Sequence, residues 1–127
     1  MKTIFAILIA VLGLSIPSVA QSGGKTSGKA AKGITTAEVK VYGNCGMCER
    51  RIEAALSELP GVNSAEWDSA TDMLTVQFDK KKANLQQIKE KVASVGHDTD
   101  DVRAKDEVYD KLHGCCKYER PAPMKVN

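Results

Sequence analysis

Two cysteines separated by two residues, in Cys45-Gly46-Met47-Cys48, are the side chains of this sequence best suited to chemistry. Sulfur atoms at this spacing can converge on one soft metal ion, or they can oxidise to a disulfide. Before the motif, residues 39–42 alternate in polarity as a strand does, and residues 49–59 after it have the apolar periodicity of a helix. The sequence therefore predicts that the motif lies at a strand-to-helix turn.

Metal binding requires the thiolate form of cysteine, and the start of a helix favours that form. Free N–H groups and the helix dipole lower the pKa of a nearby thiol from its usual value of about 8.5. Two thiolates suit the soft ions Cu(I), Hg(II) or Zn(II) better than hard ions. A structural zinc site needs four ligands, whereas only two are local here, so the pair predicts an open site from which an ion can exchange.

A second group of candidate ligands lies near the C-terminus, in His113-Gly114-Cys115-Cys116. If this segment folds back over the first motif, His113, Cys115 and Cys116 add donors to the same site. The alternatives are a disulfide, within this pair or to the first pair, and thiols kept for contact with a partner. A disulfide within either pair closes a very short loop and constrains little of the unfolded chain, which weakens the interpretation as a disulfide scaffold.

The elements expected to position these residues follow one another in the order βαββαβ. Strands are predicted at 35–41, 62–68 and 73–78, with a short fourth strand at 99–102. Pro60-Gly61 ends the first helix, Asn84 caps the second, and Gly96 suits the left-handed backbone after it. This order predicts an α+β, ferredoxin-like fold, with a four-stranded antiparallel sheet and both helices on one face.

The two ends of the chain differ from this domain in composition. Residues 1–20 combine Lys2, an apolar run over 4–16 and small residues before a cleavage position after Ala20, which is typical of a signal peptide. An uncleaved membrane anchor is the alternative. We interpret 21–33 as a flexible linker, 34–103 as the domain and 104–127 as a cysteine-containing extension. The expected location is the bacterial periplasm.

The element order and the two-cysteine loop resemble the heavy-metal-associated domain family over residues 34–103. That family includes copper chaperones, the N-terminal domains of copper-exporting ATPases and exported mercury-binding proteins. The resemblance implies that Cys45 and Cys48 are the main metal ligands. The usual family motif is Gly-Met-x-Cys-x-x-Cys, and Gly43 stands here at the position of its Met, whose side chain packs under the loop. We expect Met47 to take over that packing.

His97 is of interest through the same resemblance, because the loop after the second helix comes near the metal site in the family. It is a candidate third ligand or a hydrogen-bond donor to a ligand, and the alternative is a solvated loop histidine. An imidazole ligand would make the metal affinity depend on pH near its pKa of about 6.5. Trp67 is expected to serve packing, and the acidic residues Asp98, Asp100 and Asp101 are expected at the surface.

These features favour an exported protein that binds Cu(I) through Cys45 and Cys48 and sequesters it or transfers it by ligand exchange. The nearest alternative is Hg(II) binding, and Zn(II) is also compatible with thiolates. A thiol–disulfide oxidoreductase fits less well, because no Trp precedes Cys45 and no proline in the body of the domain suits a cis peptide bond. We therefore expect a metal carrier and no enzyme.

The expected partner is a metal-transfer protein, such as a copper efflux or transport component. The 18 basic and 16 acidic residues leave a formal net charge of +2, which identifies no partner by itself. Because no basic stripe with interleaved aromatic residues is present, nucleic-acid binding is not expected. The mature form is expected to be a monomer that is not embedded in the membrane.

Overall fold

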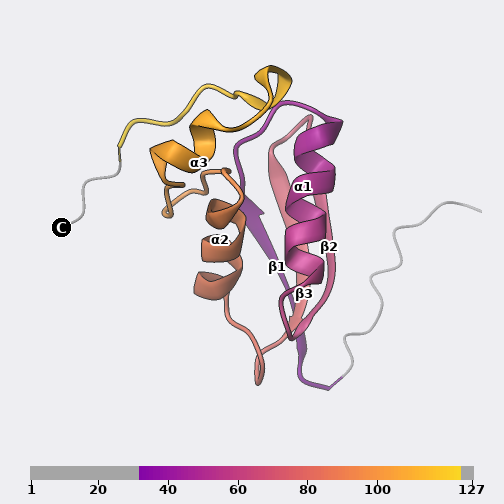
Figure 1. The fold of residues 1–127 in the computed structure, drawn as a ribbon. Coiled ribbons are helices and arrows are strands. Elements are labelled where there is room, and N and C mark those ends of the chain that lie inside the picture. Colours follow the sequence, from indigo (N-terminus) through magenta and orange to yellow (C-terminus); the bar gives the residue numbers. More distant parts are fainter. Residues whose placement is uncertain (1–31, 124–127) are drawn as a thin grey trace, which may run out of the picture.

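The computed structural model describes residues 32–123, and the predicted signal peptide and most of the predicted linker lie outside them. Helices and strands follow the chain from the indigo strand to the yellow C-terminal segment in Figure 1. In order, the elements are β1 Ile34–Lys40, α1 Gly46–Ser57, β2 Val62–Asp68, β3 Met73–Asp79, α2 Leu85–Ser94, α3 Asp106–Asp110 and the short 3-10 helix η1 Gly114–Cys116.

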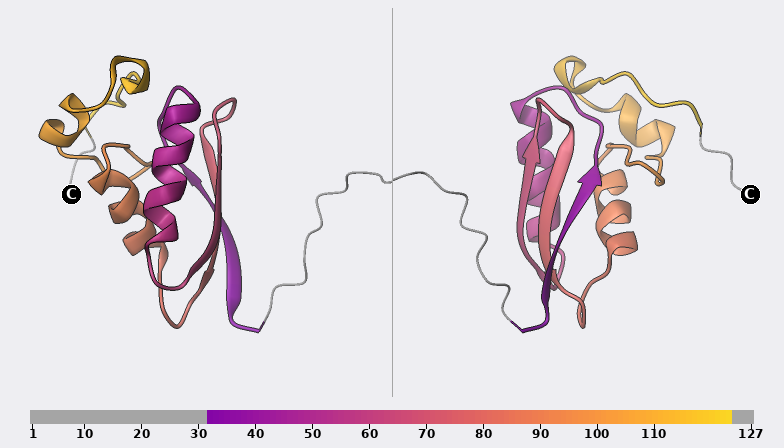
Figure 2. Two further views of the ribbon diagram at one scale, coloured as in Figure 1. Left: turned by 45° about the vertical axis from the view of Figure 1, so that its right-hand side comes forward. Right: turned by 180° about the vertical axis from the view of Figure 1, so that it is seen from behind.

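The sheet consists of three antiparallel strands in the order β1-β3-β2, so β3 lies in the centre. Alternation along β3 buries Leu74, Val76 and Phe78 in the core. Both long helices cover the same face of the sheet (Figure 2), and Ile52 of α1 and Ile88 of α2 are fully buried in that core. The predicted α+β arrangement, with two helices on one face, is confirmed.

The predicted fourth strand at 99–102 was wrong. Among residues 32–123, this segment contributes only an isolated bridge between Val41 and Thr99. The N–H of Thr99 donates to the carbonyl of Val102 at 2.8 Å, and its hydroxyl accepts the N–H of Val102 at 2.9 Å. Because these bonds close a tight turn, the segment does not extend along β1, and the sheet stops at three strands.

The ends of α2 agree with the sequence. Asn84 and Gln87 form a capping box, in which the Asn84 side chain accepts the N–H of Gln87 at 2.9 Å and the Gln87 side chain accepts the N–H of Asn84 at 3.1 Å. Gly96 follows with φ +100°, and a Cβ there would lie 3.0 Å from the Leu112 side chain. Gly96 therefore both ends the helix and makes room for the C-terminal segment.

Residues 104–123 fold back across the end of the domain at which α1 begins (Figures 1 and 2). The short helix α3 comes first, and η1 then lies against the start of α1. Within 32–123, no helix has the combination of length and apolar character that a bilayer crossing requires. The extension thus packs on the domain and brings the second cysteine pair to the loop of the first.

Candidate metal centre

The two cysteines of the first motif lie at the beginning of α1, as predicted. Cys45 is the residue before the helix, with an extended backbone (φ −151°, ψ 173°), and Cys48 is in the first turn. Their Sγ atoms are 3.7 Å apart. Cys48 is fully buried, whereas Cys45 is partly exposed. This geometry brings two sulfur atoms together, one buried in the domain and one partly exposed.

The C-terminal segment adds its own cysteines to this pair. The Sγ of Cys116 lies 3.8 Å from that of Cys45 and 3.9 Å from that of Cys115. The sulfur atoms of Cys45, Cys115 and Cys116 all lie within 4.8 Å of one another. All four cysteines are free thiols, so the structure has no disulfide between or within the two pairs.

A methionine completes this group of sulfur atoms. The Sγ of Cys115 lies 3.5 Å from the Sδ of Met47. Met47 as a residue is 42% exposed. We use the name sulfur cluster for the side chains of Cys45, Met47, Cys48, Cys115 and Cys116. The cluster combines donors from the loop before α1, from α1 and from η1.

The cysteine thiols of the cluster differ in protonation. The pKa of Cys45 is lowered to about 7, mainly by a hydrogen bond from the backbone N–H of Cys48, although partial burial opposes the shift. Burial, with the neighbouring thiols of Cys48 and Cys45, raises the pKa of Cys116 strongly. Near neutral pH, Cys45 is therefore substantially a thiolate, whereas Cys116 must lose a proton before it can act as a thiolate ligand.

His97 is not a solvated loop histidine: it is fully buried. Its Nδ1 lies 2.9 Å from the carbonyl oxygen of Tyr42, and its ring stacks on Tyr118 with centroids 5.5 Å apart. Burial lowers its pKa and outweighs the hydrogen bond to Tyr42, so the ring is neutral at neutral pH. Its Nε2 is buried with no hydrogen-bond partner among the described residues.

Neither histidine belongs to the close group of donors. Within 32–123, the only group of three or more potential ligand atoms mutually within 4.8 Å is that of Cys45, Cys115 and Cys116. His113 is exposed at the start of η1, and His97 lies in the core beside Tyr42. A ligand role for His97 and His113 stays a prediction from the sequence.

The C-terminal segment is held on the domain by a buried ion pair. Asp98 is fully buried, and its carboxylate accepts two hydrogen bonds from the guanidinium of Arg120, at 2.7 and 2.8 Å. The carboxylate also accepts the backbone N–H of Ala104 at 2.7 Å. Burial opposes ionisation of Asp98, but these hydrogen bonds, with that from Arg120 the largest, hold its pKa below the usual value.

Tyr118 provides a second attachment beside this ion pair. Its hydroxyl accepts the N–H of Asp98 and donates to the carbonyl of Gly96, both at 2.8 Å. We call Asp98, Tyr118 and Arg120 the tail clamp. The prediction that Asp98 is a surface residue was wrong, because its side chain is fully buried and paired with Arg120. Sequence reasoning missed the clamp, since its partners are 20 and 22 residues apart without any periodic signal.

The loop of the first motif rests on Trp67 rather than on a methionine. Trp67 is buried, as predicted, and its indole N–H donates to the carbonyl of Val41 at 2.9 Å. A Cβ placed on Gly43 would come within 2.8 Å of two ring atoms of Trp67. The expectation that Met47 packs under the loop was wrong, because Met47 is exposed and Trp67 occupies the space beside Gly43.

A Gly43→Met variant, which restores the usual family residue, is therefore expected to destabilise the protein by about 1–3 kcal/mol, because a rigid indole ring cannot move aside. Urea unfolding followed by circular dichroism measures the change in all variants. Combining Gly43→Met with Trp67→Leu should cost less than the sum of the two single variants, since the smaller side chain makes room. Wild-type stability of Gly43→Met would contradict this account of the loop.

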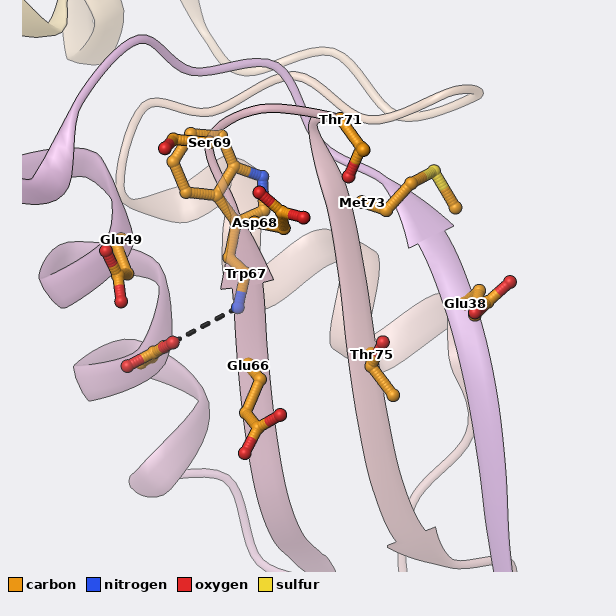
Figure 3. Close-up of a pocket in the computed structure, with 10 residues that line it drawn as sticks. Glu38, Glu49, Glu66, Trp67, Asp68, Ser69, Thr71, Met73 and Thr75 are labelled. Atoms are coloured by element: carbon orange, nitrogen blue, oxygen red, sulfur yellow. Dashed lines mark hydrogen bonds between the residues drawn. The ribbon is translucent and has the colours of Figure 1, made fainter. Parts of the chain in front are cut away.

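A large surface hollow lies elsewhere, beside β2, and has a volume of about 840 Å³. Figure 3 shows its acidic lining. At its edge, the backbone N–H of Trp67 donates to the Glu53 carboxylate at 3.1 Å. It is lined by Glu38, Glu49, Glu53, Glu66, Trp67, Asp68, Ser69, Thr71, Met73 and Thr75. Because no cysteine lines it, this hollow is separate from the sulfur cluster.

Comparison with known protein families gives a match over the domain. The model of the heavy-metal-associated domain matches residues 44–98, a range that includes Cys45 and Cys48 and ends before Cys115 and Cys116. The copper chaperone CopZ of Staphylococcus aureus is 34% identical over 55 residues, which are 43% of this chain and 81% of that protein. The similarity thus covers most of the relative but not the C-terminal segment of this chain.

Solved structures extend the similarity to the fold. The N-terminal domain of a potential copper-translocating P-type ATPase from Bacillus subtilis, in the Cu(I)-loaded state, is 31% identical with a TM-score of 0.50, over 52% of this chain and 84% of that one. Oxidized MerP from Ralstonia metallidurans CH34 is 25% identical with a TM-score of 0.50, over 52% of this chain and 93% of that one. These similarities support the predicted ferredoxin-like fold of the domain.

Proposed function

Since this chain belongs to the heavy-metal-associated domain family, we propose that it binds Cu(I) through Cys45 and Cys48 and sequesters it or transfers it by ligand exchange. The strongest support is the pair of sulfur atoms 3.7 Å apart at the start of α1. Two soft donors in one place favour a soft ion. The relative from Staphylococcus aureus is described as a copper chaperone, which favours copper among the soft ions.

The exposure of the two thiols suggests how exchange proceeds. Cys45 is partly exposed and has a pKa of about 7, so it is the ligand that an approaching partner meets first. Cys48 is fully buried and holds the ion from the protein side. A partner thiolate that binds the ion replaces Cys45 before Cys48, and the ion leaves without ever being free in solution.

The partner and the location belong to the same proposal. A metal-transport protein with a similar thiol site is the fitting acceptor, and the B. subtilis domain with this fold comes from a potential copper-translocating P-type ATPase. The signal-like residues 1–20 support export to the periplasm. The carrier needs no catalytic residue, because exchange of one sulfur ligand for another breaks no covalent bond of the protein.

Anaerobic titration of the reduced protein with Cu(I) in the presence of a chromogenic Cu(I) chelator tests this function. The protein is expected to withdraw Cu(I) from the chelator, and a Cys45→Ser/Cys48→Ser variant is expected to lose that ability. Zn(II) added in excess should not displace the bound copper, because thiolates favour the softer ion. Failure to compete, or equal competition by the double variant, would refute the proposal.

Hg(II) is a second candidate ion, favoured by the likeness to MerP. Thiolates bind both ions, so affinity alone does not separate the two functions. Growth of a deletion strain separates them: increased sensitivity to copper salts is expected for a copper carrier, whereas a change confined to mercury salts would assign the protein to mercury. Complementation with the Cys45→Ser/Cys48→Ser variant controls for the site.

A further inference from the structure

The sulfur cluster contains more donors than one Cu(I) ion of a two-thiol carrier uses. Cys45 and Cys48 account for one ion, which leaves two thiols and one thioether in contact with the same pair. Neighbouring sulfur atoms are 3.7 Å apart from Cys48 to Cys45, 3.8 Å from Cys45 to Cys116, 3.9 Å from Cys116 to Cys115 and 3.5 Å from Cys115 to Met47. The donors thus form a continuous series.

A single tetrahedral ion does not fit this arrangement. With metal–sulfur bonds of about 2.3 Å, all six sulfur–sulfur separations in a four-thiolate site are about 3.8 Å. Here the group mutually within 4.8 Å contains Cys45, Cys115 and Cys116 but not Cys48. Cys48 neighbours Cys45 and Cys116 without joining this close group, so the four thiols are better described as two overlapping sets that share Cys45.

The surroundings keep both sets in place. The backbone N–H of Asn44 donates to the Sγ of Cys48 at 3.5 Å, and the Asn44 side chain donates to the carbonyl of Lys117 at 3.0 Å. Cys48 and Cys116 are fully buried, whereas Cys115 and Met47 are exposed. An ion can therefore enter the second set from solvent while the tail clamp holds Cys116 against Cys45.

From this geometry we infer that one chain binds two Cu(I) ions, the first between Cys45 and Cys48 and the second among Cys45, Cys115 and Cys116, with the Cys45 thiolate bridging both and Met47 as an additional donor. The inference rests on the proposed copper function. Each ion enters as Cu(I) and the thiols that bind it release their protons, so no oxidant or reductant takes part. The C-terminal segment then doubles the copper capacity of the domain.

Native mass spectrometry of the reduced protein, saturated with Cu(I) and freed of excess metal under anaerobic conditions, tests this inference. The monomer mass with two copper ions is expected for the wild type, and the monomer mass with one is expected for Cys115→Ser/Cys116→Ser. X-ray absorption should show a copper–copper distance in the wild type that is absent from the variant. Circular dichroism verifies that the variant is folded.

Because Cys116 is buried, the single variant Cys115→Ser provides a second test that leaves the core intact. It is expected to retain the first ion and to weaken the second, and Met47→Leu, which removes only the thioether, is expected to have the smaller effect. A wild-type monomer that saturates with one ion would overturn the inference while leaving the proposed function standing. A wild type that binds no copper would refute both, and two ions in the double variant would overturn the assignment of the second set.

Discussion

A Cys45→Ser variant is expected to bind Cu(I) at least about 100-fold more weakly than the wild type, the largest loss among the four single cysteine-to-serine variants. Removing even a residue that only orients a metal ligand costs about 10–100-fold in affinity, and Cys45 is a ligand in its own right. Its sulfur lies 3.7 Å from that of Cys48 and 3.8 Å from that of Cys116, so it is close to a thiol of each cysteine pair while also being partly exposed. Its pKa of about 7 lets this thiol ionise readily at neutral pH.

Competition with a Cu(I) chelator at pH 7 measures this effect in all four variants. Cys115→Ser is the matched control, because Cys115 is exposed at the other end of the cluster, where its sulfur lies beside Met47 and Cys116. We expect its first ion to be bound with nearly wild-type affinity. If Cys115→Ser lost as much affinity for the first ion as Cys45→Ser, the central role of Cys45 would be refuted.

Replacing Arg120 by methionine is expected to lower the free energy of unfolding by about 3–5 kcal/mol, because the buried carboxylate of Asp98 loses its partner. That is a large part of the stability of about 5–15 kcal/mol that is usual for a domain. Urea unfolding at pH 7 measures the change. Lys117→Met, which removes a partly exposed cation from the same segment, is the control and should cost less than about 1 kcal/mol.

The pH dependence of this effect has a definite sign. Because the pKa of Asp98 is lowered in the folded protein, the ion pair stabilises the fold above the unfolded pKa of about 3.9 and this contribution is lost as pH falls through the folded value. The difference between wild type and Arg120→Met should therefore shrink below about pH 4. A constant difference across that range would show that lost packing, and not the ion pair, accounts for the change.

Much of the fold could be predicted because its signals are local. The alternation in β3, the apolar stripes of α1 and α2 and the cap at Asn84 each lie within one element. The fourth strand failed because the side chain of Thr99 offered the backbone of Val102 a different hydrogen-bond partner. A short polar segment carries too little pattern to reveal that competition.

The site was predictable only in part, because some of its contacts join residues that are far apart in the sequence. Cys45 and Cys48 are recognisable from their spacing, whereas the approach of Cys116 depends on Asp98, Tyr118 and Arg120, whose contacts span long stretches of chain. Trp67 packs under the loop in the place of the family methionine, but the only trace of this in the sequence is Gly43 at the position where the family has Met. Complementarity between Gly43 and Trp67 is a property of the folded structure, and each residue alone is uninformative.

The separation of the two cysteine pairs along the chain also fixes an order of assembly during protein synthesis. Cys116 follows Cys45 by 71 residues, and the tail clamp that secures it is complete only when Arg120 has been added. A growing chain therefore offers a bare two-cysteine loop long before it offers the full sulfur cluster. The full cluster can close only in a chain that has been translated to its C-terminal segment.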